Sequence, residues 1–339
     1  MDKICLVPQV HGIGGMVSFR AKMIAGLQQR GIAVTHDLRD RAISAVLVIG
    51  GTRDLLGLWR VRRRGIPVVQ RLDGMNWIHR KRRTGLRHFL RAEYGNQLLQ
   101  LIRTRLAERL VYQSRFAKSW WEQVYGKTRQ PNWIVYNGVD LQCYTPDGPH
   151  QRPQGSWRIL MVEGSMGGGY EMGLESGVAL VRLLGENFPA HPVELQVVGY
   201  VPVNTQLKWQ TINEIAINFA GTVPGEQIPF VDRSAHLLFS ADINAACPNA
   251  VIEALACGLP VVAFNTGALG ELVEDDAGRI VPYGGDVWQL QPPDISQLAQ
   301  AAAEILVEQE HFRRAARRLA EERFSLDRMI DDYMGALLG

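Results

Sequence analysis

Residues 247–262 read CPNAVIEALACGLPVV, and they decide the fold of the second half of the chain. Helix-forming residues follow Pro248 and stop at Gly258, and Pro260 then opens an apolar, β-branched run. A proline at the start of a helix and a glycine just past its end are typical boundary signals. The stretch therefore predicts a helix followed directly by a buried strand, as in a parallel α/β sheet.

The start of this helix offers groups that suit a phosphorylated ligand. The first N–H groups of a helix, here at Asn249, Ala250 and Val251, lack intrahelical acceptors and carry the positive end of the helix dipole. Glu253 follows within about one turn, where its carboxylate can accept hydrogen bonds from a ribose diol. This is the most specific segment of the chain.

Short apolar runs alternate with helical patterns on both sides of this segment. The alternation predicts two α/β domains of Rossmann type, each built on a parallel sheet. The expected strands are 4–7, 46–49, 67–71, 159–162, 195–198, 217–220, 237–239 and 260–264. The expected helices are 16–30, a long one through Leu90, Tyr94, Leu98 and Leu101, then 174–184, 250–257, 295–307 and two amphipathic helices at the carboxy-terminal end.

Length and composition agree with a two-domain globular protein. The chain has 339 residues, of which 46% are hydrophobic and 21% charged, and a domain typically takes roughly 150 residues. The proline-rich and glycine-rich stretch 144–157 reads as a linker. We therefore expect an amino-terminal domain at 1–143, the linker at 144–157, a second domain at 158–322, and a carboxy-terminal helix at 323–339 packing back on the first domain.

No apolar run approaches the ~18 residues of a membrane span, and no cleavage-type pattern follows the first strand. The four cysteines are scattered, which suits a reducing compartment. The eight histidines show no close metal spacing, so we expect no structural metal site.

The net charge of +3 conceals a strong asymmetry. Residues 1–148 hold 25 Lys/Arg and 10 Asp/Glu, a balance of +15, whereas residues 149–339 hold 12 and 24, a balance of −12. Basic clusters lie at 60–64 and 77–91, the second reading WIHRKRRTGLRHFLR. They fit an anionic membrane surface, an anionic acceptor or a solvated helix face. No nucleic-acid motif accompanies the charge, so nucleic acid is not an expected partner.

Two segments of the first domain stand where ligands bind in open α/β sheets. The loop HGIGGM at 11–16 lies between a strand and a helix, and it fits either an anion site or a tight turn. It is not a GxGxxG fingerprint. Arg71 and Asp73 lie at the end of the strand 67–71, and they fit either a ligand cleft or a surface arginine beside a helix-capping aspartate.

Together these motifs resemble the family-4 glycosyltransferases, also called glycosyl transferases group 1. The most specific stretches are VIEALACGLPVVA at 251–263 and YNGVD at 136–140. The glycine loop, QSRF at 113–116, GTV at 221–223 and GALGEL at 267–272 extend the resemblance almost end to end. The family has the GT-B fold of two facing Rossmann-like domains, and it transfers sugars from nucleotide-sugar donors with retained configuration and no bound metal.

The resemblance implies roles by position. Glu253 resembles the ribose-binding glutamate, Asn249 to Val251 the backbone clamp on the diphosphate, and Asp73 an N-domain contact to the donor sugar or acceptor. We take Asp73 and Glu253 as the catalytic candidates. Donor-binding candidates are Gly14, Gly15, Gly164, Ser165, Thr222, Asn249, Ala250, Val251 and Glu253, and acceptor or membrane candidates are Arg71, Arg80, Arg82 and Arg83.

The chain departs from the family pattern at two places. The family has a second glutamate eight positions before the ribose-binding one, and this chain has Ala245 there. The family also carries an arginine and a lysine after the first strand of the second domain, whereas residues 163–173 contain no cation. Two lost charge-assisted hydrogen bonds amount to about 3–6 kcal/mol, or on the order of a hundredfold to ten-thousandfold in donor affinity.

The resulting expectation is a metal-independent retaining hexosyltransferase that needs no cofactor and acts on a glycan, glycolipid or lipid-linked acceptor. Its expected location is the cytoplasm, with peripheral attachment to the inner face of the membrane as a further expectation. The alternative is a degenerate, non-catalytic GT-B protein that binds glycan or membrane or partners an active transferase.

Overall fold

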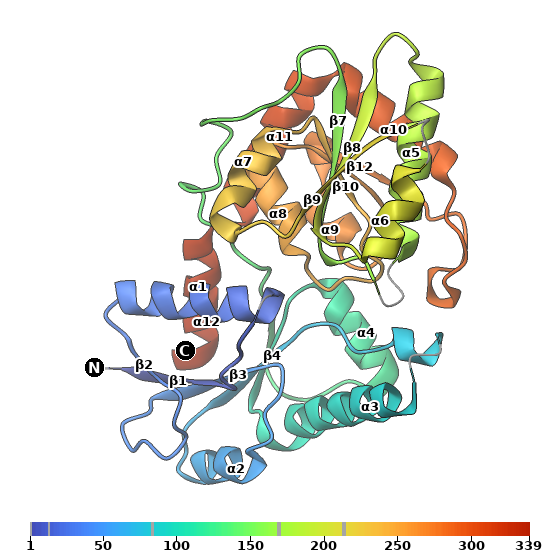
Figure 1. Cartoon of the computed structure of the whole chain (residues 1–339). Coiled ribbons are helices and arrows are strands. Elements are labelled where there is room, and N and C mark those ends of the chain that lie inside the picture. Colours follow the sequence, from blue (N-terminus) through green and yellow to red (C-terminus); the bar gives the residue numbers. More distant parts are fainter. Residues whose placement is uncertain (1, 13, 83–84, 168–170, 212–214) are drawn as a thin grey trace. The chain divides into compact units, whose positions relative to one another are not determined.

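The computed structural model describes residues 2–12, 14–82, 85–167, 171–211 and 215–339. The chain divides into two compact units (Figure 1). Unit 1 comprises Met1–Gly138 and Leu326–Gly339, and unit 2 comprises Val139–Ser325.

Unit 1 is built on a six-stranded parallel sheet in the order β2-β1-β3-β4-β5-β6. Its strands are β1 (Lys3–Val7), β2 (Ala33–Thr35), β3 (Ala45–Ile49), β4 (Val68–Leu72), β5 (Arg109–Tyr112) and β6 (Asn132–Ile134). Its helices are α1 (Gly15–Gln29), α2 (Leu55–Arg63), η1 (Ile78–Arg80), α3 (Leu86–Leu101), η2 (Ile102–Leu106), α4 (Arg115–Tyr125) and α12 (Leu326–Leu338).

Unit 2 repeats this plan with a six-stranded parallel sheet in the order β12-β11-β10-β7-β8-β9. Its strands are β7 (Trp157–Ser165), β8 (Val193–Tyr200), β9 (Ala216–Gly221), β10 (Leu237–Ser240), β11 (Val261–Phe264) and β12 (Gly278–Val281). Its helices are α5 (Glu171–Asn187), α6 (Val203–Gln210), η3 (Gly225–Gln227), α7 (Ile228–Arg233), α8 (Asn249–Ala256), α9 (Leu269–Leu272), η4 (Asp275–Ala277), η5 (Val287–Gln289), α10 (Ile295–Val307) and α11 (Gln309–Arg323).

The prediction of two parallel α/β sheets is confirmed. Every predicted strand is present, with each end within three residues of the predicted one, and the predicted helix and strand around Gly258 are α8 and β11. Four strands had not been predicted: β2, β5, β6 and β12. Each has only three or four residues, and three of them lie at a sheet edge. The four-residue strands β10 and β11 were predicted because their runs are almost wholly apolar, whereas β2, β5, β6 and β12 include polar or small residues such as Thr35, Arg109, Asn132 and Gly278, which interrupt the apolar pattern.

The carboxy-terminal helix α12 belongs to the core of unit 1. Figure 1 shows it beside α1, and its apolar face packs with α1 and the sheet in one core. Gly26 of α1 allows the close approach, because a Cβ at this position would lie 2.6 Å from Cγ1 of the buried Ile330. The Phe19 and Tyr333 rings meet with centroids 5.1 Å apart.

The segment 144–157, predicted as a linker, lies in unit 2 and is held there by two arginines. Arg317 of α11 donates to the carbonyl oxygens of Tyr144 and Ala256, both at 2.7 Å. Arg233 of α7 donates to the carbonyl oxygens of Thr145 and Pro149, both at 3.1 Å. Carbonyl oxygens of this segment, which lie outside helices and strands, thereby receive hydrogen bonds from arginine side chains.

Within the described part of the chain, no helix is both long enough and apolar enough to cross a bilayer.

The packing of α12 predicts a large effect of truncating Ile330. Ile330→Ala removes a fully buried side chain from the contact between α1 and α12, and such changes cost about 2–5 kcal/mol. We expect a clearly lowered midpoint of chemical denaturation. Leu338→Ala is the matched control on the same helix, because Leu338 is 39% exposed. Equal midpoints for the two variants would contradict this packing.

Candidate functional site

The glycine loop of unit 1 opens directly into α1. Gly14 precedes the helix with φ 133° and, being a glycine, provides no side-chain cap to the helix start. The backbone of Gly14 accepts from the N–H groups of Val17 and Ser18, both at 3.1 Å. A Cβ added at Gly14 or Gly15 would meet no other described atom within 4 Å. These exposed glycines therefore leave open space at the positive end of α1.

Arg71 lies inside unit 1 and is only 1% exposed. Its guanidinium stacks 4.0 Å from the centroid of the Phe19 ring and donates to Oδ1 of Asn137 at 3.2 Å. When the side-chain amide of Gln113 is oriented with its oxygen toward Arg71, that oxygen accepts further hydrogen bonds from the Arg71 guanidinium. This buried arginine is therefore engaged with polar groups of its own unit, which argues against a direct contact with a membrane.

Asp73 follows β4 at the same sheet edge as the glycine loop, since the strands are parallel. Its carbonyl oxygen accepts from Nε1 of Trp121 at 2.7 Å, which fixes the backbone at this point. Burial raises the pKa of the Asp73 carboxyl, and the positive charge of Arg71 opposes that rise.

The other predicted acceptor or membrane cations differ in their surroundings. Arg80 donates to both carboxylate oxygens of Glu93, at 2.5 and 2.7 Å, and His79 also contacts Glu93 at 2.8 Å. The hydrogen bonds from Arg80 and then His79 lower the pKa of Glu93 to about 2. The charge of Arg80 is thus matched within unit 1. Arg82 is partly exposed, and Arg83 lies outside the described residues.

In unit 2 the predicted donor-site residues lie at the carboxyl ends of the strands or in the helix that follows. Asn249, Ala250 and Val251 form the first turn of α8 after Pro248, without a side-chain cap from that residue. Glu253 follows in α8 and is partly buried. Gly164 and Ser165 end β7, and Thr222 comes directly after β9; all three are exposed.

Beside Glu253 lies an acid that the sequence analysis missed. Asp232 of α7 is 1% exposed and accepts a hydrogen bond from the thiol of Cys257. Its Oδ2 has no hydrogen-bond partner among the described residues. Burial, and then the charge of Glu253, raise the pKa of Asp232 well above its usual value. Its position four residues after the buried Ile228 was an available signal, because this spacing puts both on one helix face.

A second pair of acids stands at the ends of the neighbouring strands β7 and β10. Glu163 lies in β7 and Asp242 two residues past β10. Burial raises the pKa of Asp242 to about 6. Burial, and then the charge of Asp242, raise the pKa of Glu163 well above its usual value. The sequence around Glu163 stands out for its lack of cations, but no sequence pattern predicts Asp242 as the neighbour of Glu163.

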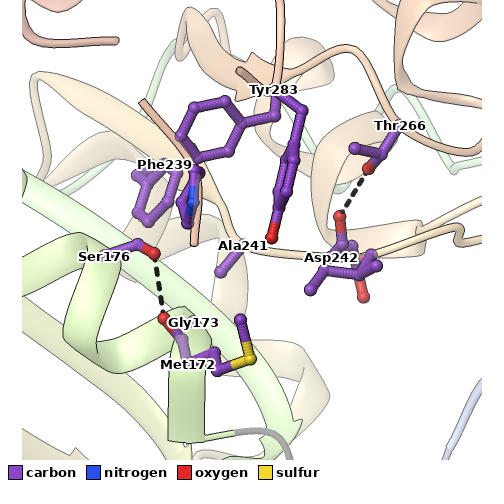
Figure 2. A pocket seen from close by; sticks show the side chains of 11 residues that line it. Met172, Gly173, Ser176, Phe239, Ala241, Asp242, Thr266 and Tyr283 are labelled. Atoms are coloured by element: carbon purple, nitrogen blue, oxygen red, sulfur yellow. Dashed lines mark hydrogen bonds between the residues drawn. The ribbon is translucent and has the colours of Figure 1, made fainter. Parts of the chain in front are cut away.

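Asp242 is one of the residues that line a small pocket (Figure 2). Met172, Gly173 and Ser176 of α5 face Phe239, Thr266 and Tyr283 across it. Its volume is about 10 Å³, close to the minimum for one water molecule. Thr266 donates to the carbonyl oxygen of Asp242 at 3.0 Å. The pocket is therefore too small for a sugar, and its wall fixes the backbone that carries Asp242.

The position of Ala245 is held by a close backbone contact. Gly267 has φ 58°, and a Cβ there would lie 2.5 Å from the carbonyl oxygen of Ala245. That oxygen also accepts from the N–H of Ala268 at 2.9 Å. The GALGEL motif at 267–272 thus has a structural reason to begin with glycine.

The sequence of unit 2 matches a known family. Residues 160–308 match the sequence model described as "Glycosyl transferases group 1". The resemblance predicted from the sequence is thereby confirmed. No curated protein matches the chain in sequence.

Solved structures share the fold over nearly the whole chain. Sucrose-phosphate synthase from Thermosynechococcus elongatus has a TM-score of 0.75 at 14% identity, covering 99% of this chain and 98% of that one. HepE from Anabaena, solved in complex with UDP-glucose, has a TM-score of 0.64 at 16% identity, covering 99% and 100%. WaaG, a glycosyltransferase involved in lipopolysaccharide biosynthesis, has a TM-score of 0.67 at 13% identity, covering 99% and 100%. The predicted GT-B fold is confirmed.

The raised pKa of Asp242 predicts how Asp242→Asn changes stability with pH. While it is neutral, Asp242 contributes to the free energy of unfolding of the native protein. This contribution is lost as pH rises from the pKa of the carboxyl in the unfolded chain, near 3.8, through its native pKa of about 6. An asparagine cannot ionise, so the variant should gain stability relative to the native protein, by about 1–3 kcal/mol, between about pH 4 and about pH 8. Denaturation midpoints across this range measure the gain.

The control for this experiment is Asp147→Asn, at an exposed site of the same unit. A gain that does not depend on pH, or that appears equally in the control, would contradict the raised pKa of Asp242.

Proposed function

We propose that this chain, whose unit 2 matches the group 1 glycosyltransferases, is a retaining, metal-independent hexosyltransferase. It would move a sugar from a nucleotide-sugar donor to a glycan, glycolipid or lipid-linked acceptor. The observation that carries the proposal is the start of α8, where a helix N-terminus and Glu253 lie together at the carboxyl edge of the sheet. Two of the structurally similar proteins, HepE from Anabaena and a pneumococcal O-GlcNAc transferase, were solved with UDP bound.

In this proposal the protein acts by positioning. The N–H groups of Asn249 to Val251 receive the diphosphate, and Glu253 accepts hydrogen bonds from the ribose. The acceptor oxygen bonds to the anomeric carbon while the bond to the diphosphate oxygen breaks, and the leaving phosphate takes the acceptor proton. Orientation and stabilisation of the developing charge supply the rate enhancement.

In the same proposal, residues of unit 1 would also contact the reacting molecules. Gly14 and Gly15 offer exposed backbone at the positive end of α1 for the donor phosphates. Asp73 has a raised pKa, which favours a carboxyl able to donate a hydrogen bond to a sugar hydroxyl. It lies at the same sheet edge as the glycines.

One observation favours the second candidate function, a degenerate GT-B protein that binds without catalysis. Glu163 and Asp242 place two acids near the ends of β7 and β10, in the region where the family carries cations. Ionised carboxylates would repel a diphosphate. Such a protein would bind a glycan, a membrane or an active transferase in place of a nucleotide sugar.

Nucleotide binding separates the two candidates. In a thermal-shift screen with UDP, GDP, ADP, CMP and dTDP, each with and without its common sugars, we expect one nucleotide diphosphate to stabilise the chain. Glu253→Gln should weaken its affinity about tenfold to a hundredfold, because a charge-assisted hydrogen bond is lost. Glu310→Gln on α11, at an exposed site, is the matched control.

Transfer activity is then measured with the donor so identified. Glu253→Gln and Gly15→Trp should both reduce it, whereas Glu310→Gln should not. Unchanged activity in the first two variants would refute the assigned site. If no nucleotide of the panel stabilises the chain in the thermal-shift screen, the non-catalytic candidate is favoured.

We further propose that the chain is cytoplasmic and attaches to an anionic inner membrane surface through α2 and α3. On α3, Leu86, Leu90 and Tyr94 are 73%, 59% and 56% exposed. Their spacing puts them in one stripe. Arg87 and Arg91 are exposed beside this stripe, and exposed apolar side chains with flanking cations are typical of helices that lie in a membrane interface.

Leu90→Glu tests this attachment. The change puts a negative charge into the apolar stripe, so co-sedimentation with vesicles containing anionic lipid should fall. The matched control is Leu207→Glu on α6 of unit 2, where the leucine is 55% exposed. Binding of the native chain should weaken with salt and be absent with neutral vesicles. Equal binding to both kinds of vesicle would refute the proposal.

A further inference from the structure

A cleft of about 490 Å³ opens in unit 1 between the end of α2, the η2 segment and the loop from α4 to β6. We call it the basic cleft, and its lining includes Arg62, Thr104, Glu108, Lys127, Arg129 and Gln130. Its volume lies in the range of roughly 300–1,000 Å³ that is typical of small-molecule sites. All of its lining residues belong to unit 1.

The basic cleft lies at the opposite edge of the sheet from the candidate site residues of unit 1. Glu108 directly precedes β5, and Pro131 directly precedes β6. Gly14 and Asp73, in contrast, follow the ends of β1 and β4. Because all strands of this sheet are parallel, the basic cleft is a separate site.

The charges in the basic cleft are unbalanced. Arg62 is partly matched, because its Nε lies 3.5 Å from Oε1 of Glu108 and it also donates to the carbonyl oxygen of Arg105. Lys127 and Arg129 are exposed, and no ion pair to a described residue involves either of them. Three cations thus face one carboxylate.

The loop that carries Lys127 and Arg129 is anchored on both sides of these residues. Arg103 is fully buried and donates to the carbonyl oxygen of Gly126 at 2.8 Å. Gln130 in turn donates to the carbonyl oxygen of Arg103 at 3.1 Å. Arg103 is itself fixed by a hydrogen bond of 3.1 Å to the hydroxyl of Tyr112.

This anchoring fixes the backbone that carries the two cations before any ligand arrives. Ordering a flexible loop on binding reduces affinity, and a preformed loop avoids that loss. A guanidinium fork matches the oxygens of a phosphate, and an ammonium adds a point charge beside it. Among anions, the arrangement therefore suits a phosphate ester or a diphosphate.

We propose that the basic cleft binds a phosphate group, carried either by a soluble phosphorylated molecule or by a lipid headgroup. Both sources present the same chemistry to Arg62, Lys127 and Arg129. The proposal is independent of the transferase function, because the basic cleft shares no residue with the candidate donor site.

Hydrogen exchange on the intact chain tests the proposal, with inorganic pyrophosphate as the soluble probe and vesicles containing phosphatidic acid as the lipid probe. We expect one or both probes to slow exchange at 104–109 and 126–132. The double variant Lys127→Ala with Arg129→Ala should lose this protection and bind the effective probe about tenfold or more weakly. Protection by pyrophosphate identifies a soluble ligand, and protection by vesicles alone identifies a headgroup.

The matched control is Arg39→Ala with Arg41→Ala, which removes the same charge from exposed sites of unit 1 outside the basic cleft. It should keep the protection. A Glu253→Gln chain should also keep it, so failure of the transferase proposal leaves this test intact. Unchanged protection in the Lys127/Arg129 variant, or no protection by either probe, would overturn the proposal.

Discussion

Parallel pairing constrains both sheets, since every strand pair in each of them is parallel. A parallel pair requires a crossover between its strands, so all strand ends of one sheet reach the same edge. In unit 1 this edge receives the glycine loop and Asp73, and in unit 2 it receives Ser165, Thr222 and the start of α8. The opposite edge of unit 1 is thereby left to the basic cleft. The topology alone thus assigns the candidate donor-binding residues and the basic cleft to different surfaces.

Burial controls the electrostatics of the acidic residues at the strand ends and beside α8, in each unit separately. Asp73, Glu163, Asp232 and Asp242 all have raised pKa values, and burial is the largest cause in each case. A neutral carboxyl can donate a hydrogen bond, and it does not repel a phosphate. In unit 2, Glu163 and Asp242 lie at the ends of neighbouring strands, so protonation of either one lowers the repulsion that a phosphate would meet there. A protonated Glu163 would reduce the negative charge of the stretch 163–173, whereas Asp242, with a pKa of about 6, carries its charge at neutral pH.

Most of the fold could be predicted from the sequence, and the start of α8 could be predicted with it. The strongest signals were local ones, such as Pro248, Gly258 and the continuous apolar run of β11. What could not be predicted depends on contacts between distant residues. The helical spacing of Leu90, Tyr94 and Leu101 correctly predicted α3, yet these side chains are 59%, 56% and 42% exposed. Periodicity identifies a helix face, but it does not say whether that face meets the core or the solvent. Asp232 was missed for the same reason, since its neighbour Cys257 follows the end of another helix, α8.

The positive charge of the amino-terminal half is a second feature whose role could not be predicted from the sequence alone. In the sequence its cations are alike, and their number indicates only that an anion is an expected partner. The structure divides them by environment. Arg71 and Arg103 are buried and satisfy polar groups of unit 1, and Arg80 is paired with Glu93. A buried guanidinium cannot touch an outside partner, and a paired one already has its carboxylate, so these residues stabilise the fold. The exposed cations on α2, on α3 and in the basic cleft are therefore the ones whose removal should change what the protein binds.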